Sequence, residues 1–476
     1  KEQKMELMIP LNTKGPGPMY EQIYRFIKEE IRQGNLTAGS RLPSTRVLAE
    51  NLKVSRSTTQ MAYEQLLSEG YIDSEPCRGY YVAQIEELVE VKEAPAGRFV
   101  PEQEEKGNGI DVDFSPRGID LDRFPFQIWR KISRNVLVDD NRALFLNGDP
   151  QGEYALRQAI GSYLHSARGV RCRPDQIIIG AGSEYLLMLL SLILGGDRVI
   201  AMENPTYKQA YRVFRSQGYQ VRPVNMDRSG IMASELDGGM GEGADTVYVM
   251  PSHQYPMGTV MSVRRRQELL SWACAKEGRY LIEDDYDSEF RYKGKPIPAL
   301  QGMDQNGRVI YIGTFSKSIA PAIRIGFLVL PQELMMRYRE KAGFFSSTVS
   351  RPDQNILYQF LTEGHYERHL NRMRAVYKGK HDILLGGLRD FEEAFSIGGE
   401  YAGLHVLLTD RKGRYTEEEL EKAAGKKGIR VYGLSRYFIH PEHNSYPPTV
   451  LLGYASLSAE EIQRGLKGLK EAWGIA

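Results

Sequence analysis

The stretch Val309–Ser318, with the sequence VIYIGTFSKS, is followed six residues later by Arg324. Its first four residues, Val309–Ile312, form a short apolar run typical of a buried strand. Directly after this run, hydroxyl side chains stand near Lys317 on both sides. The pattern therefore places a nucleophilic amine at a strand end, together with hydroxyls and a guanidinium that can bind an anion.

These groups suit pyridoxal 5′-phosphate (PLP). The amine of Lys317 can form a Schiff base with the PLP aldehyde. Thr314, Ser316 and Arg324 can hold the phosphate by hydrogen bonds and charge. A lysine is most often a solvated surface residue, so the stretch needs support from other parts of the chain.

A second polar group follows another apolar run, in Ile282–Asp287 (IEDDYD). PLP withdraws electrons well only when its ring nitrogen stays protonated, and a carboxylate beside that nitrogen secures the proton. We assign this role to Asp284. Tyr286 lies two positions on, hence on the same face of an extended chain, and can reach the ring hydroxyl. A polar loop or a metal site is the competing interpretation of this run.

Two weaker motifs complete the set. In Gly180–Glu184 (GAGSE), the residues Gly182, Ser183 and Glu184 stand between a predicted strand and a predicted helix, where backbone N–H groups bind phosphate. Tyr207 can stack on the pyridine ring. Each motif alone has many false matches, but their order and their shared strand-end positions indicate one cofactor site.

The same part of the chain predicts an α/β domain. Helical patterns alternate with short apolar runs, which favours a largely parallel sheet. The runs are Gln176–Ile179, Arg198–Ala201, Thr246–Met250, Tyr280–Ile282 and Val309–Ile312. From about Asn355 onward, mixed helices and strands predict a smaller lobe.

The first segment has another character. Apolar residues at helical spacing in Tyr20–Ile31 predict a helix, and Thr45–Leu52 and Arg56–Glu69 predict two more around a tight turn. Tyr71–Val82 predicts a hairpin. Three helices and a hairpin form a winged helix-turn-helix, although a small helical bundle with a solvated basic face would show a similar pattern.

The third helix would present its first turn to the bases in the major groove of DNA. That turn carries Arg56, Ser57, Thr58 and Gln60. Arginine can pair with guanine and glutamine with adenine. Between Ser40 and Gln60 there are four basic residues and one acidic residue, which can neutralise DNA phosphates.

Composition sets the domain limits. Ile85–Gly109 holds seven glutamates and few aromatic residues, as linkers do. We therefore expect a DNA-binding domain at residues 1–84, an acidic linker at 85–110 and a PLP-binding effector domain at 111–476. The net charge of +1 excludes a polycation, so the DNA-binding surface is local.

Several features predict a cytoplasmic protein without membrane contact. The three cysteines are too few and too far apart for a disulfide framework or a metal site. The first ten residues do not resemble a signal peptide. The longest apolar stretch, Tyr185–Leu194, is shorter than a membrane helix. His365 and His369 stand four apart, but no third ligand is evident, so we expect a polar helix face and no metal.

The first segment resembles the GntR family of bacterial regulators. The matching stretches are Leu42–Arg46, Val54–Thr58, Ala62–Leu66 and Glu69–Tyr71. The resemblance implies DNA contacts at Arg46, Arg56, Ser57, Thr58 and Gln60, with Arg78 and Gly79 at the tip of the wing. Many relatives have a basic residue at the position of Gln60, which leaves the base preference open.

The rest of the chain resembles fold-type I aminotransferases, and more closely the MocR/GabR subfamily of GntR regulators. Ser252–Gly258 (SHQYPMG), Glu363–Leu370 and Gly433–Arg436 carry this resemblance. It implies that Arg436 binds a carboxylate of the effector and that the protein is a head-to-tail homodimer. The GABA-responsive member has an arginine where this chain has Gln209, which argues against GABA as the effector.

Three functions follow as hypotheses. The first is a PLP-dependent transcription regulator that binds promoter DNA and senses a small amino compound through the Schiff base at Lys317, without net turnover. The second is a working aminotransferase with an accessory DNA-binding head. The third is a regulator for which PLP itself is the signal.

Overall fold

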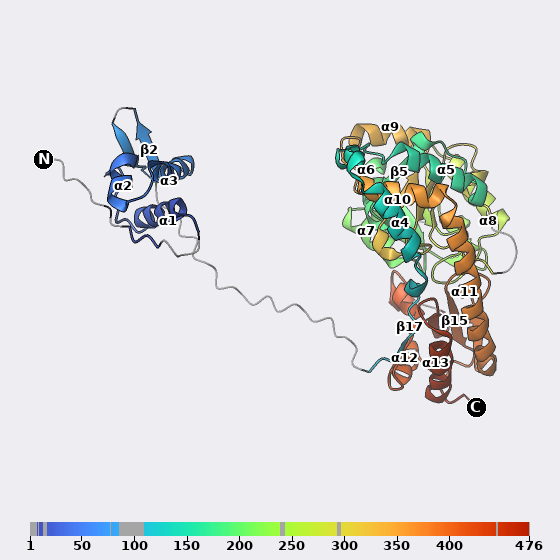
Figure 1. Ribbon diagram of the computed structural model, residues 1–476. Helices are drawn as coiled ribbons and strands as arrows, with labels where there is room; N and C mark the ends of the chain where they lie inside the picture. Colours follow the sequence, from blue (N-terminus) through green and yellow to red (C-terminus); the bar gives the residue numbers. More distant parts are fainter. Residues whose placement is uncertain are drawn as a thin grey trace. The chain divides into compact units, whose positions relative to one another are not determined.

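The computed structural model describes residues 7, 9–12, 17–76, 78–84, 109–238, 243–292, 297–443 and 446–475. The chain divides into two compact units, residues 1–106 and 107–476, called here the head and the body (Figure 1). Nearly all of the predicted linker, residues 85–110, lies outside the described residues. Among those that are described, no helix is both long and apolar enough to cross a membrane.

The head contains the three predicted helices and the predicted hairpin. A short additional strand completes an antiparallel sheet of order β1-β3-β2. Two residues are too few to show an alternating pattern, so this strand was not predicted. The elements are α1 (Met19–Arg32), β1 (Arg41–Leu42), α2 (Thr45–Leu52), α3 (Arg56–Ser68), β2 (Ile72–Glu75) and β3 (Gly79–Val82).

Local hydrogen bonds fix the angle between α2 and α3. Lys53 ends α2 in the left-handed conformation, with φ of 53°, which turns the chain within two residues. Ser55 then caps α3, since its hydroxyl accepts a 3.2 Å hydrogen bond from the backbone N–H of Thr58. The buried hydroxyl of Thr59 donates to the carbonyl of Thr45 over 2.8 Å and ties the two helices together. The head is therefore a winged helix-turn-helix.

The centre of the body is a seven-stranded sheet of order β5-β13-β12-β11-β10-β6-β7. β13 runs antiparallel to both neighbours, and every other pairing is parallel. The prediction of a largely parallel sheet is confirmed, and each of the five apolar runs lies within a strand apart from at most one residue at its end. The strands are β5 (Ile177–Gly180), β6 (Val199–Glu203), β7 (Gln220–Val224), β10 (Thr246–Val249), β11 (Tyr280–Asp285), β12 (Val309–Thr314) and β13 (Gly326–Val329).

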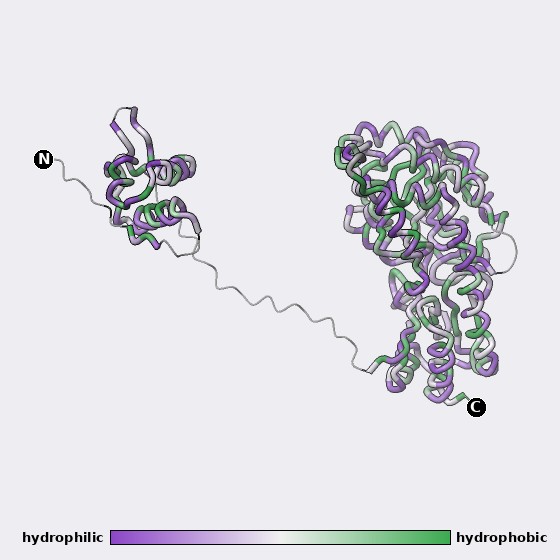
Figure 2. Tube along the Cα trace, viewed as in Figure 1, coloured by the Kyte–Doolittle hydropathy of each residue, from purple (hydrophilic) through white to green (hydrophobic). Residues whose placement is uncertain are grey.

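Helices cover both faces of this sheet. On β12, Ile310 and Ile312 pack with α6, α7 and α9, whereas Tyr311 packs on the opposite face with α4, α5 and α10. Figure 2 shows hydrophobic and hydrophilic stretches alternating along these helices, as one-sided burial requires. Their bounds are α4 (Phe126–Val136), α5 (Tyr154–Arg168), α6 (Ser183–Leu194), α7 (Lys208–Ser216), α8 (Val263–Cys274), α9 (Gln332–Lys341) and α10 (Arg351–Thr362).

A smaller lobe completes the body. Its antiparallel sheet has the order β14-β15-β18-β17, and a short strand from the start of the body, β4, pairs with β16 beside it. The elements are β4 (Val112–Asp113), α11 (His365–Leu388), β14 (Phe395–Gly398), β15 (His405–Asp410), α12 (Glu417–Gly425), β16 (Ile429–Arg430), β17 (Tyr432–Gly433), β18 (Thr449–Gly453) and α13 (Ala459–Ala472).

The long helix α11 links the two lobes (Figure 1). Near its start, Tyr366 and Leu370 pack in the core of the large lobe, and near its end Leu384 and Leu388 pack in the core of the small lobe. The predicted lobe boundary near Asn355 is therefore too early. α10 belongs to the large lobe because its apolar side chains pack against α4 and α5.

A buried ion pair joins α5 to the sheet. Arg168 Nε lies 2.8 Å from Asp285 Oδ2, and the two side chains are only 4% and 2% exposed. The hydroxyl of Tyr311 donates to the same carboxylate oxygen over 2.5 Å. The guanidinium also donates to Ser252 Oγ over 2.7 Å. Asp285 would thus become an unpaired buried charge if the arginine were removed.

We predict that Arg168→Met lowers the free energy of unfolding of the body by about 3–5 kcal/mol, the usual effect of breaking a buried pair from one side. Chemical denaturation followed by circular dichroism measures this. The matched control is Arg264→Met, because Arg264 is 90% exposed and its ion pair with Glu268 lies in solvent. Equal effects of the two substitutions would contradict the prediction.

Candidate functional site

A pocket of about 270 Å³ opens beside the carboxyl ends of β11 and β12. Nine of the ten residues that the sequence predicts to bind PLP line it, and the tenth, Gly182, adjoins it. The lining residues are Pro116, Arg117, Ser183, Glu184, Tyr207, Gln209, Met250, Tyr255, Asp284, Tyr286, Thr314, Ser316, Lys317, Pro321 and Arg324.

Lys317 follows β12, as predicted, and its amine points into this pocket. Nζ donates to the carbonyl oxygen of Arg117 over 2.9 Å and to that of Pro116 over 3.3 Å. Burial lowers the pKa of Lys317 to about 8, although Asp287 opposes this shift. A useful fraction of the amine is therefore neutral and nucleophilic near neutral pH.

Asp284 is the buried carboxylate of the pocket. It pairs in register with Ile312 of β12, is only 5% exposed and accepts a hydrogen bond from the hydroxyl of Tyr248. Burial raises the pKa of Asp284 to about 7, and Asp285 adds to this rise, whereas Tyr248 opposes it. No cation is found beside this carboxylate among the described residues, so a protonated ring nitrogen would supply the missing partner.

Tyr286 lies on the same face as Asp284, two residues further on. Its hydroxyl is 2.9 Å from Nδ1 of His253, and the same nitrogen is 2.9 Å from Oδ2 of Asp287. Burial raises the pKa of Tyr286 well above its usual value, and the negative charge of Asp287 adds to the effect. The phenol therefore keeps its proton and can donate it in a hydrogen bond.

The turn between β5 and α6 fits an anion. Gly182 has φ of +87°, and a Cβ there would lie 2.5 Å from a guanidinium nitrogen of Arg324, so glycine is required. The next residue, Ser183, begins α6, whose first N–H groups have no partner within the helix. Thr314 and Ser316 line the same pocket.

Arg324 stands beside this turn and already has a carboxylate partner. Its NH2 group donates to Glu184 over 2.8 Å and to the carbonyl of Ala181 over 3.2 Å. A guanidinium carries five N–H donors and can bind a phosphate beside that carboxylate. Together with the amine and the buried carboxylate, this donor set fits PLP.

Tyr207, which is predicted to stack on the cofactor, and Arg436, which is predicted to bind the effector carboxylate, lie in two different places. Tyr207 lines the pocket, with its ring edge-on to that of Tyr255 at 6.1 Å, and Gln209 lies beside it. Arg436 is not among the lining residues. Its guanidinium donates to Glu421 of α12 over 2.6 Å, and the side chain is 58% exposed.

Five lining residues were not predicted: Pro116, Arg117, Met250, Tyr255 and Pro321. Tyr255 lies within the SHQYPMG motif, which was used for the resemblance and not for the site. Arg117 belongs to a loop after β4 and matches no motif or periodic pattern. Packing of this loop between the two lobes brings it to the pocket: the Arg117 carbonyl accepts a hydrogen bond from Lys317, and Gly118 lies against Ser456.

The predicted DNA contacts lie on the helix-turn-helix and the wing of the head. Arg56, Ser57 and Gln60 are exposed in the first turns of α3, and Thr58 is half-buried. Gln60 donates to Glu64 of the same helix over 2.9 Å. A base would have to replace this intrahelical contact.

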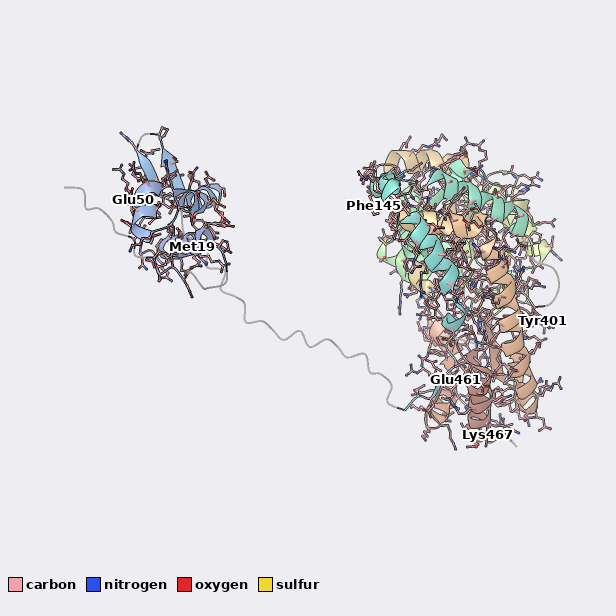
Figure 3. All side chains as sticks on the ribbon, viewed as in Figure 1. Met19, Glu50, Phe145, Tyr401, Glu461 and Lys467 are labelled. Carbon is pink, nitrogen blue, oxygen red and sulfur yellow. The ribbon has the colours of Figure 1, made fainter. Side chains whose placement is uncertain are left out.

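The other two arginines that are predicted to contact DNA form ion pairs with acidic residues. Arg46 pairs with Glu50 on α2 over 3.1 Å (Glu50 is labelled in Figure 3). Arg78, in the turn of the wing, pairs with Glu75 over 3.3 Å. The next residue, Gly79, has φ of +118°, a conformation that favours glycine. Both ion pairs are exposed, so exchanging the carboxylates for DNA phosphates costs little.

Comparisons with known families match the head and the body separately. Residues 19–82 match the family described as bacterial regulatory proteins, gntR family. Residues 120–468 match the family described as aminotransferase class I and II. The head thus belongs to a DNA-binding family, and the fold of the body implies PLP as cofactor.

Relatives share the whole arrangement. The chain is 40% identical over 470 residues to the HTH-type transcriptional regulator YhdI of Bacillus subtilis, with 98% of each chain covered. It is 32% identical to the probable rhizopine catabolism regulatory protein MocR of Rhizobium meliloti, covering 98% of this chain and 96% of that one.

Among solved structures, the kynurenine aminotransferase of Pyrococcus horikoshii matches with a TM-score of 0.67 and 25% identity, over 76% of this chain and 90% of that chain. The body therefore resembles an aminotransferase in its three-dimensional fold as well as in its sequence. The chain belongs to the MocR-type transcription regulators of the gntR family, in which a winged helix-turn-helix precedes an aminotransferase-like domain.

Proposed function

We propose that the head binds promoter DNA and that the body senses a small amino compound through PLP held on Lys317. One observation carries the proposal. The amine of Lys317, the buried carboxylate of Asp284 and the turn at Gly182 meet at one pocket, in a chain whose head is a winged helix-turn-helix.

Each group has a distinct part in holding the cofactor. Lys317 would bond to the aldehyde carbon, Asp284 would keep the proton on the ring nitrogen, and Tyr286 would donate to the ring hydroxyl. Tyr207 would stack on the ring. The phosphate would be held by groups that can donate hydrogen bonds to it: the backbone of Gly182, Ser183 and Glu184 and the side chains of Ser183, Thr314, Ser316 and Arg324.

When bound, PLP would supply an electrophilic carbon for the amine of the effector. Lys317 would have a free amine whenever it is not bonded to that carbon. That amine can donate to the carbonyls of Pro116 and Arg117, the contacts found in this structure. These carbonyls belong to the segment after β4, at the start of the body, so arrival of an effector changes contacts on the side of the chain that leads to the head.

We further propose that the protein acts as a homodimer. Large apolar side chains are exposed between residues 121 and 154 of the body. Phe145, labelled in Figure 3, is 71% exposed. Exposed apolar side chains in such number mark an interaction surface. The others are Leu121, Phe126, Leu137, Val138, Leu146 and Tyr154. The head-to-tail arrangement stays a prediction from the family resemblance.

We predict that Arg56→Ala weakens binding to the DNA duplex that the wild-type protein selects from a random pool. The loss should be about 10- to 100-fold, as expected when an arginine–guanine pair is removed. Fluorescence anisotropy at fixed salt measures it. Arg32→Ala is the matched control, because Arg32 is about half exposed but lies at the end of α1. A similar loss in both variants would contradict the assignment of α3.

The sensing role predicts that Lys317→Ala abolishes the response of transcription to amino compounds while leaving DNA affinity unchanged. Run-off transcription from a template that carries the selected duplex, with PLP and a panel of amino acids, tests this. An unchanged response in the variant would remove Lys317 from the sensor. Sustained turnover of an amino donor and a keto acid by the wild type would instead favour the aminotransferase hypothesis.

The lowered pKa of Lys317 predicts how PLP uptake depends on pH. Only the neutral amine attacks, and for a pKa of about 8 its fraction rises about fivefold between pH 7 and pH 8 and then levels off above pH 9. Stopped-flow absorbance of the apoprotein mixed with PLP measures the rate. A rate that still rises tenfold per pH unit up to pH 10 would show an unperturbed lysine.

A further inference from the structure

Met61 is an apolar exception on the exposed face of α3. The other exposed side chains of this helix are all polar, and they are Arg56, Ser57, Gln60, Glu64, Gln65 and Ser68. Met61 is 49% exposed, whereas methionine is among the residues most often buried in proteins. Within the described part of the head, the one other large apolar side chain that is exposed is Val47 of α2. Both therefore belong to the helix-turn-helix.

Helical geometry places Met61 in the middle of the exposed face of α3. The opposite side of the helix, which packs in the core of the head, is formed by the buried residues Thr59, Ala62, Tyr63 and Leu66. At about 100° per residue, the centre of the exposed face lies between Ser57 and Met61, which are about 40° apart. Ser57 is one of the predicted DNA contacts, so a duplex that it touches also meets the side chain of Met61.

The chemistry of methionine limits what Met61 can recognise on a base. The edges of the base pairs in the major groove present hydrogen-bond donors and acceptors, and the methyl group that they present is the one on C5 of thymine. A thioether is only a weak acceptor, so it has little to offer the polar groups. The side chain is flexible and apolar, and it adapts readily to a small apolar partner. A thymine methyl group is therefore the feature that suits Met61.

The polar neighbours of Met61 are engaged within the head, and Met61 differs from them in this respect. Ser57 Oγ lies 2.8 Å from Ser55 Oγ, and Gln60 donates to Glu64 over 2.9 Å. A base has to replace these contacts before either side chain can read it. A contact between Met61 and a methyl group breaks no hydrogen bond and removes water from two apolar groups.

We propose that Met61 recognises a thymine in the DNA site through its methyl group. The proposal rests on the DNA-binding part of the proposed function, since it assigns a base to the helix that begins at Arg56. It requires an A·T pair at one position of the site, with the thymine methyl group against α3. Loss of that methyl group weakens binding by about three- to tenfold, the usual effect of removing one small apolar contact.

The test uses the full-length protein and the duplex that it selects from a random pool. Each thymine of that duplex is replaced in turn by deoxyuridine, which lacks the methyl group but keeps every hydrogen-bonding group. Fluorescence anisotropy at fixed salt gives the affinity for each duplex. For at least one position, deoxyuridine should weaken binding by the wild-type protein by about three- to tenfold.

Variants connect this preference for thymine to one side chain. Met61→Ala should bind the thymine duplex more weakly than the wild type does, and should bind the thymine and deoxyuridine duplexes equally, as a double-mutant cycle requires of a direct contact. Met61→Leu keeps an apolar side chain of similar size and should retain part of the preference. Val47→Ala is the matched control, because Val47 is 43% exposed on α2, and it should leave the preference unchanged.

Two results would overturn the proposal. In the first, no deoxyuridine replacement weakens binding by the wild-type protein. In the second, Met61→Ala binds more weakly but keeps the full preference for thymine, which would assign Met61 to a contact with protein instead of DNA. A wild-type protein that selects no duplex from the pool would refute the DNA-binding part of the proposed function itself, so the two failures are distinguishable.

Discussion

The parallel pairing of β11 with β12 is the constraint on which the site depends. In that register Asp284 stands opposite Ile312, and Lys317 follows three residues after the end of β12. The carboxyl ends of parallel strands meet at one edge of the sheet, so an acid and an amine from distant parts of the sequence face one pocket. A shift of β11 by one residue would turn Asp284 to the other face.

The two faces of β11 separate two kinds of chemistry. Asp284 and Tyr286 face the pocket, whereas Asp285 turns away and pairs with Arg168. Glu283, on the same side as Asp285, accepts hydrogen bonds from the backbone N–H groups of Leu300 and Gln301. Consecutive acidic residues therefore have different roles. Glu283 and Asp285 stabilise the sheet, whereas Asp284 faces the pocket and has no cationic partner among the described residues.

The sequence predicts well whatever depends on local patterns. The helix-turn-helix follows from capping serines and helical periodicity, and the strand-end motifs lead to Asp284, Lys317 and the turn at Gly182, which the structure brings to one pocket. Contacts that arise only from tertiary packing were not predictable. Arg117 reaches the pocket because its loop packs between the lobes, and Arg436 is engaged by Glu421, which no motif connects with it.

Dependence on tertiary packing also explains why the start of the small lobe was predicted too early. The pattern of α10 resembles any amphipathic helix, and it does not reveal which core receives its apolar face. Packing against α4 and α5 decides that question. Likewise β4 joins the small lobe through a two-residue pairing with β16, which no sequence periodicity could indicate.

The central claim is that the amine at position 317 holds the cofactor covalently. Borohydride reduction of the PLP-loaded protein, followed by peptide mass mapping, tests it most directly. The account predicts the pyridoxyl phosphate adduct on the peptide that contains Lys317. An adduct on another lysine, or none in a folded protein supplied with PLP, would contradict it.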